Sequence, residues 1–122
     1  MEPTVSDGSL HFINLLAYTG DHTPARGDIV AIETGHARAM YLKRILALPG
    51  ETIAFVDDKL VVNGKVLTEP YVVHRNHEPW NMNAQAVGRS EYFVAGDNRG
   101  SYREQHLHGP VHEENILGTL AW

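Results

Sequence analysis

One lysine of this sequence stands where its amine could act as a base. Lys43 lies inside the apolar run 41–46, whereas Lys59 and Lys65 flank turns. A lysine buried among apolar groups loses the hydration that favours its charge, so its pKa falls. To serve as a base near neutral pH, the amine must shift its pKa from roughly 10.4 to about 7. The pattern alone also permits an edge-strand lysine whose amine reaches solvent, which is the commoner situation.

Alternation along a strand assigns the neighbours of Lys43 to two faces. Lys43 shares one face with Tyr41 and Ile45, and the opposite face carries Leu42, Arg44 and Leu46. The strand, predicted over 40–48, therefore presents an amine on one side and a guanidinium on the other.

Two further motifs stand on either side of this strand in the chain. The sequence begins Met1-Glu2-Pro3-Thr4-Val5, and a hydrophobic run at 91–95 leads directly into Gly96-Asp97-Asn98-Arg99. Side chains of an Asp-Asn turn bond readily to local backbone, so each motif alone is an ordinary turn or terminus. Their occurrence in this order, with Lys43 between them, is what calls for a functional interpretation.

Composition excludes several other chemistries. The chain has 122 residues and no cysteine, which excludes disulfides, cysteine-based zinc sites and a thiol nucleophile. A formal net charge of −5 argues against a nucleic-acid partner, which would favour a basic surface. The longest apolar stretches, such as 15–18 and 29–32, are far shorter than the roughly 20 residues of a membrane helix. We therefore expect one soluble globular domain.

Glycine and proline divide the chain into short runs rich in Val, Ile, Leu and Tyr, a pattern typical of strands. Asn63-Gly64 between apolar runs predicts a two-residue hairpin turn, and Asp57-Asp58 predicts another just before it. Residues 52–67 thus form a predicted three-strand meander, while 74–90 lacks periodicity and is predicted to be a loop. We expect an all-β fold without a helix of more than a turn or two. The predicted strands are 10–18, 28–33, 40–48, 52–56, 60–62, 66–67, 71–73, 92–95 and 116–121.

Together the motifs make this sequence resemble the extracytoplasmic catalytic domain of bacterial type I signal peptidases, which are membrane-anchored serine proteases with a Ser/Lys dyad. The family's blocks are matched in order at 1–4, 26–30, 41–53, 62–65, 92–99, 109–111 and 116–118. The resemblance implies a single domain over 1–122 with the family's mixed β fold. It also implies a catalytic core of about 1–56 and 91–122 and a smaller hairpin-and-loop cap of about 57–90.

The resemblance implies a role for each matched polar residue. Lys43 matches the general base, which takes the serine proton during attack and returns it to the leaving amine. Arg44 resembles the residue that pairs with Asp97 and clamps the lysine strand against the turn. Where the family has a serine that orients the lysine amine, this sequence has Tyr102, with Ser101 one place earlier, so either hydroxyl could do so.

Substrate binding is implied in the same way. Met1, Val5, Tyr41 and Leu42 match positions that line the pockets for small residues at −1 and −3 of a signal peptide. An extended peptide can add to the strand that carries Leu42 and Lys43. The implied partners are the signal peptides of preproteins and, through an anchor upstream of this sequence, the cell membrane. The catalytic domain would stand on the extracytoplasmic side, with no cofactor, metal or nucleic acid.

One departure from the family concerns the nucleophile. The family's serine comes directly before the Met-x-Pro-Thr block, and here that block begins at Met1. We therefore expect the serine and the anchor to precede this sequence, and the chain as given to be inactive. The alternatives are a catalytically dead peptide-binding domain of the same fold and a self-cleaving Ser/Lys protease of the repressor type. The latter would need a DNA-binding module and a cleavage segment upstream.

Histidines suggest two further alternatives. His106 and His108 would share one face of a strand, and His112 or the pair His74 and His77 could complete a metal site. Scattered surface histidines are the ordinary interpretation. A Ser-His-Asp hydrolase is disfavoured because the sequence contains no Gly-x-Ser-x-Gly motif.

Overall fold

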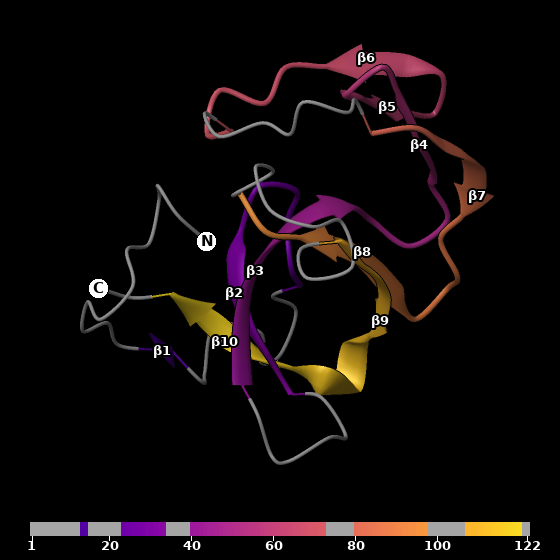
Figure 1. The fold of residues 1–122 in the computed structure, drawn as a ribbon. Coiled ribbons are helices and arrows are strands. Elements are labelled where there is room, and N and C mark those ends of the chain that lie inside the picture. The colour runs from indigo at the N-terminus through magenta and orange to yellow at the C-terminus, as the bar shows by residue number, and fades with distance from the viewer. Residues whose placement is uncertain (1–12, 15–22, 34–39, 73–79, 98–106, 121–122) are drawn as a thin grey trace.

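Two antiparallel sheets make up the part of the chain that the computed structural model describes, residues 13–14, 23–33, 40–72, 80–97 and 107–120 (Figure 1). Within these ranges the helical structure is a single short 3₁₀ turn, Glu113–Asn115. The all-β prediction is therefore confirmed. None of the described ranges contains a helix long and apolar enough to span a membrane.

The larger sheet has the strand order β1-β10-β2-β3-β8-β9. Its middle strands pair residues far apart in sequence, because β3 lies between β2 and β8. The bounds are β1 Ile13–Asn14, β2 Ile29–Glu33, β3 Met40–Ala47, β8 Glu91–Ala95, β9 Leu107–His112 and β10 Ile116–Leu120.

The smaller sheet has the order β6-β5-β4-β7 and lies along one side of the larger sheet, at the top of Figure 1. Its strands are β4 Thr52–Val56, β5 Lys59–Val62, β6 Lys65–Leu67 and β7 Met82–Ala86. Asn63 and Gly64 have φ values of 51° and 78°, and Asp57 and Asp58 have 48° and 72°. Both turns thus take the left-handed conformation that two-residue hairpins require, and the predicted meander over 52–67 is confirmed.

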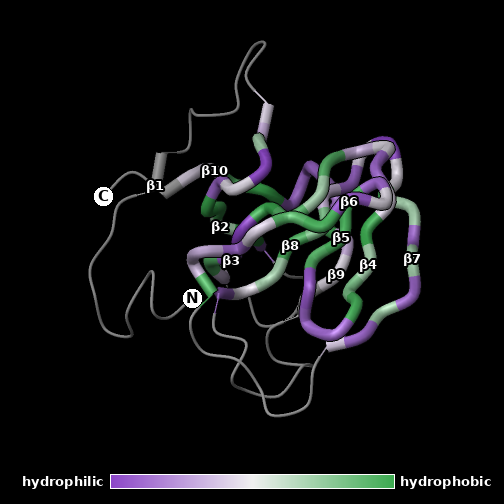
Figure 2. Tube along the Cα trace, turned by 90° about the horizontal axis from the view of Figure 1, so that it is seen from above, coloured by the Kyte–Doolittle hydropathy of each residue, from purple (hydrophilic) through white to green (hydrophobic). Residues whose placement is uncertain are grey.

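Buried apolar side chains cover both faces of the larger sheet. One cluster lies between the two sheets and joins Leu46 and Phe93 of the larger sheet to Phe55 and Leu60 of the smaller one. A second cluster, on the opposite face, consists of Val30, Ile32, Ile45, Tyr92 and Val94. In Figure 2 hydrophobic colour accordingly predominates along β2 and β8 of the larger sheet and along β4 and β5 of the smaller sheet. The alternation predicted along β3 is confirmed, since Ile45 and Leu46 belong to different clusters.

Three strand predictions were wrong in informative ways. Residues 82–86, predicted as loop, form β7, although Asn, Gln and Ala are poor strand formers; pairing with β4 outweighs their preference. Strand β9 was not predicted, because its Gly109-Pro110 pair looks like a break, but an edge strand tolerates proline. Tyr71 and Val72, predicted as strand, instead follow a turn in which the Val72 amide donates to the Glu69 carbonyl, 3.1 Å.

Candidate catalytic site

Strand β3 holds Lys43 in the interior of the larger sheet. Lys43 pairs with Val30 of β2, and its neighbours on the same face, Ile32 and Ile45, are fully buried. Lys43 itself is only 6% exposed, and burial lowers the pKa of its amine below the ordinary 10.5. Loss of hydration destabilises the ammonium form, which is the physical condition for a lysine that acts as a base.

Arg44, on the opposite face of β3, forms a bidentate ion pair with Asp97. Its Nε donates to Asp97 Oδ1 at 2.9 Å and its Nη2 to Asp97 Oδ2 at 2.8 Å. Nη1 donates to the Gly27 carbonyl at 2.8 Å. The Asp97 side chain is completely buried and that of Arg44 is 12% exposed. The predicted pairing of these two residues is confirmed, and it fastens the end of β8 to the strand that carries Lys43.

The segment before β2 extends the pairing along the same part of β3. The Gly27 amide donates to the Ile45 carbonyl at 2.8 Å, and the Ile45 amide donates to the Asp28 carbonyl at 2.9 Å. The backbone amide and carbonyl of Ile45 are thus both bonded to this segment. Lys43 is two residues away, so its position depends on these contacts.

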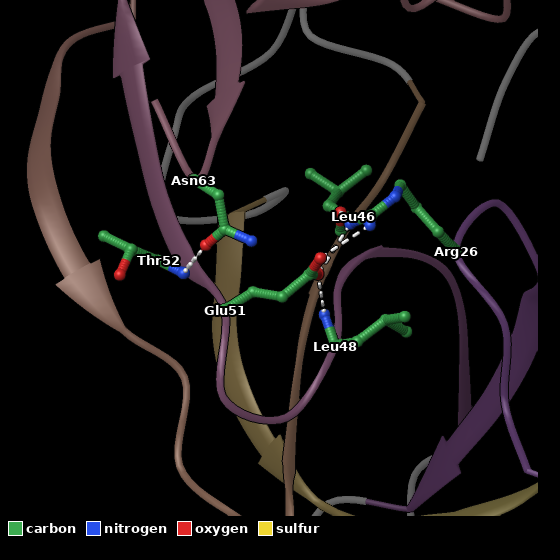
Figure 3. A network of polar contacts seen from close by, with 6 residues as sticks. All are labelled: Arg26, Leu46, Leu48, Glu51, Thr52 and Asn63. Carbon is green, nitrogen blue, oxygen red and sulfur yellow. Dashed lines mark hydrogen bonds and ion pairs between the residues drawn. The ribbon is translucent and has the colours of Figure 1, made fainter. Parts of the chain in front are cut away.

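A second ion pair, which was not predicted from the sequence, holds the end of β3 (Figure 3). Arg26 Nη1 and Nη2 donate to the two carboxylate oxygens of Glu51 at 2.7 and 2.6 Å. Arg26 Nη1 also donates to the Leu46 carbonyl at 3.1 Å, and the Leu48 amide donates to Glu51 at 2.6 Å. The hydrogen bond from Arg26 is the main cause that lowers the pKa of Glu51. The only sequence signal was a charged residue beside each of two Gly-containing turns.

Glu51 also stands at the joint between the two sheets. Its carbonyl accepts from the Val87 amide at 2.8 Å, while the Gly50 amide donates to the Val87 carbonyl at 2.9 Å. Next to it the side chain of Asn63 accepts from the Thr52 amide at 2.9 Å (Figure 3). The two chain segments that connect the sheets are therefore bonded to each other.

Tyr71 brings the smaller sheet's side of the molecule into contact with Arg44. The Arg44 guanidinium carbon lies 4.0 Å from the centre of the Tyr71 ring. The Tyr71 hydroxyl donates to Glu69 Oε2 at 3.0 Å, and Glu69 is 6% exposed. Neither residue was singled out from the sequence, because nothing local marks a tyrosine that will stack on an arginine 27 positions earlier in the chain.

The expected substrate-binding residues are only partly within the described ranges. Tyr41, 45% exposed, and Leu42, partly buried, lie on β3 beside Lys43. Met1, Val5, Ser101 and Tyr102 fall outside the described residues. The structure therefore brings together Lys43, Arg44, Asp97, Tyr41 and Leu42 of the predicted set.

The described residues contain no group of three or more histidine, aspartate or glutamate side chains that could hold a metal ion. His112 is described, and its Nδ1 accepts a hydrogen bond from the Glu114 amide at 3.2 Å. His74, His77 and His106 lie outside the described ranges.

Comparison with known proteins identifies the family. The profile of the family described as signal peptidase, peptidase S26, matches residues 1–122. This chain belongs to the signal peptidase family. The all-β architecture, with Lys43 and Arg44 on β3 and Asp97 just after β8, is thus a signal peptidase fold, as the motifs predicted.

Individual relatives agree with this assignment. Signal peptidase I T of Bacillus subtilis strain 168 is 36% identical, in an alignment that covers 98% of this chain and 66% of that protein. Signal peptidase I V of the same strain is 34% identical, with 99% and 78% covered. The crystal structure of a signal peptidase I from Enterococcus faecalis V583 is similar with a TM-score of 0.65 at 29% identity. That match covers 81% of this chain and 97% of the other. The chain thus spans just under two thirds of the length of signal peptidase I T.

Proposed function

We propose that this protein is a type I signal peptidase that removes N-terminal signal peptides from exported preproteins, with Lys43 as the general base of a Ser/Lys dyad. The observation that carries the proposal is the burial of Lys43 on the middle strand of the larger sheet. Membership of the signal peptidase family supplies the reaction class. We also propose that residues 1–122 act as a single catalytic domain.

The proposed reaction needs a neutral amine at Lys43. The amine takes the proton of the serine hydroxyl as the oxygen attacks the peptide carbonyl, and it returns that proton to the leaving amine. Water then hydrolyses the acyl-serine ester, with the lysine again accepting and returning a proton. The lowered pKa of Lys43 supports this role, because less free energy is needed to keep the amine neutral.

Substrate binding is proposed along β3. Tyr41 and Leu42, together with Met1 and Val5, would line shallow pockets that admit only small side chains at −1 and −3. The exposed ring of Tyr41 supports this placement, since it lies two residues from Lys43 on the same strand face. Ser101 or Tyr102 would orient the amine, and the domain would work on the extracytoplasmic side of the membrane.

The decisive experiment measures cleavage of a peptide with alanine at −1 and −3. It uses the protein as its gene encodes it and, in parallel, these 122 residues with a serine placed before Met1. Lys43→Ala should lower kcat/KM by about a thousandfold, as expected for the loss of a general base. The matched control Lys59→Ala, at an exposed position next to a turn, should leave kcat/KM unchanged.

The outcomes separate the alternatives. Cleavage that survives Lys43→Ala overturns the dyad. Peptide binding without cleavage, in both forms of the protein, would instead indicate a peptide-binding domain. The pH profile gives an independent check: kcat/KM should rise with pH as Lys43 loses its proton, with its midpoint below the 10.5 of an ordinary lysine.

A further inference from the structure

The Arg44 guanidinium is held from three directions by different parts of the chain. Asp97 binds its edge through two hydrogen bonds, the Gly27 carbonyl accepts from Nη1, and the Tyr71 ring lies 4.0 Å from its central carbon. The first two contacts come from the larger sheet and the segment that precedes it. Tyr71 follows β6 of the smaller sheet, so its contact with Arg44 links the smaller sheet's side of the molecule to the larger sheet.

Tyr71 is itself fixed by a buried carboxylate. Its hydroxyl donates to Glu69 Oε2 at 3.0 Å, and the Glu69–Val72 turn sets the separation between the two side chains. A carboxylate that is 6% exposed is costly to bury unless hydrogen bonds compensate for its lost hydration. The hydrogen bond at the hydroxyl end holds the Tyr71 ring beside the Arg44 guanidinium, whose central carbon lies 4.0 Å from the ring centre.

This arrangement can fix the position of β3, the strand that carries Lys43. A cation over an aromatic face is attracted most strongly where water is excluded, and the Arg44 side chain is only 12% exposed. Arg44 directly follows Lys43 in the chain. A change in the orientation of the Arg44 side chain therefore shifts the same short segment of β3. The side chains of the two residues point to opposite faces, which leaves Tyr71 on the side away from the amine.

We propose that Tyr71, oriented by Glu69, is a positioning residue for catalysis: by supporting Arg44 from the smaller sheet, it keeps the β3 backbone in the geometry that directs Lys43 at the serine. This inference rests on the proposed signal peptidase function. It gives the smaller sheet a task in the reaction, although none of its strands carries a predicted catalytic group.

The experiment measures kcat and KM for cleavage of the same alanine-containing peptide by the protein as its gene encodes it. Tyr71→Leu, which removes the aromatic face, should lower kcat by about tenfold with KM within about twofold, the size expected of one partly desolvated cation–π contact. Tyr71→Phe keeps the ring and loses only the hydrogen bond to Glu69, so its kcat should stay within about threefold of the wild-type value. Val66→Thr, at a position of the same sheet that is 58% exposed, is the control and should match the wild type.

Two results overturn the inference. One is an unchanged kcat in Tyr71→Leu, or a change confined to KM, which would indicate a substrate contact. The other is an equal loss in Tyr71→Phe and Tyr71→Leu, which would mean that the aromatic face does not act. If Tyr71→Leu does not fold, as judged by circular dichroism and its melting transition, Tyr71→Met takes its place with the same expected values.

Failure of the proposed function is distinguishable from failure of this inference. A wild type that does not cleave the peptide refutes the former, and the inference falls with it. A wild type that cleaves, and that depends on Lys43, leaves the function intact while the Tyr71 variants decide the inference. Non-additive shifts of the urea midpoint in Tyr71→Leu combined with Arg44→Met would support the contact on which the inference depends, and additive shifts would contradict it.

Discussion

The two sheets of this molecule are built from different kinds of contact. The smaller sheet joins β4, β5 and β6 through two-residue turns, and its buried side chains at the interface are large and apolar, such as Phe55 and Leu60. Trp80 packs edge-on against Phe55, with ring centres 5.4 Å apart. Its strand order can therefore be established largely by neighbours in the sequence.

The larger sheet depends on partners that are distant in the chain. Arg44 and Asp97 are 53 positions apart, and Ile116 of β10 pairs with Ile32 of β2. This sheet and the turn after β8 bury two groups that ordinarily carry charge, Lys43 and Asp97, whereas the smaller sheet's side buries one among the described residues, Glu69 after β6. Charges are expensive to bury, so each needs a partner or a shifted pKa, and such sites are where catalysis is usually found. In the proposed function the chemistry therefore lies in the sheet with long-range contacts, and the locally built sheet supports it.

The largest effect is expected where the larger sheet's buried ion pair is broken. Asp97→Ala leaves the Arg44 guanidinium largely buried without its carboxylate, so the free energy of unfolding should fall by about 3–5 kcal/mol. Urea unfolding measures this loss. The double variant Arg44→Met with Asp97→Leu removes both charges and should lose less than Asp97→Ala alone. A loss below about 1 kcal/mol, typical of an exposed pair, would contradict the contrast between the sheets.

The corresponding test of the smaller sheet is the apolar truncation Leu60→Ala. Leu60 is 2% exposed in the cluster between the sheets, so a loss of about 2–4 kcal/mol in unfolding free energy is expected. The control Val66→Ala, on an exposed side chain, should cost less than about 0.5 kcal/mol. Because no titratable group is removed, Leu60→Ala should lower stability equally at all pH values. A pH-dependent loss would show that this sheet's stability is electrostatic after all.

A smaller effect is expected at the Asn63-Gly64 turn, which joins β5 to β6 in the smaller sheet. Gly64 has a φ of 78°, where a side chain would be strained although open space surrounds it. Gly64→Ala should therefore cost about 1–2 kcal/mol, seen as a lower melting temperature, with the neighbouring Lys65→Ala as control. If Gly64→Ala is as stable as the wild type, the hairpin is held by the sheet around it and the turn does not direct its pairing.

The same contrast explains what the sequence could predict. The Asn63-Gly64 hairpin needed only two adjacent residues, and the prediction was confirmed. The Arg44–Asp97 pair was predicted from motifs that resemble the signal peptidase family, because spacing alone cannot join residues so far apart. By contrast, the Arg26–Glu51 pair and the stacking of Tyr71 on Arg44 were missed, since each depends on how two sheets meet. Strand β7 was missed for the related reason that its pairing with β4 outweighs its composition.

The smallest effect is expected at the Arg26–Glu51 pair, which lies at the joint between the sheets. The side chains are 35% and 16% exposed, so solvent screens the attraction, and Glu51→Gln should cost only about 0.5–1 kcal/mol near neutral pH. The pKa of Glu51 is lowered in the folded protein from its ordinary 4.5, mainly by the Arg26 hydrogen bond. A group with a lowered pKa stabilises the fold at pH values above its unfolded pKa, and that stabilisation is lost as pH falls through the folded pKa.

Glu51→Gln should therefore differ from the wild type in urea unfolding at about pH 7 and converge with it well below pH 4.5, once the carboxylate is protonated. Glutamine still offers an oxygen to the Leu48 amide, so the variant isolates the charge from that hydrogen bond. Salt at about 1 M should reduce the difference at neutral pH, since screening acts on exposed pairs. A difference that is the same at both pH values would show that the joint is held by the hydrogen bonds between Gly50, Glu51 and Val87, and that the ion pair adds nothing to them.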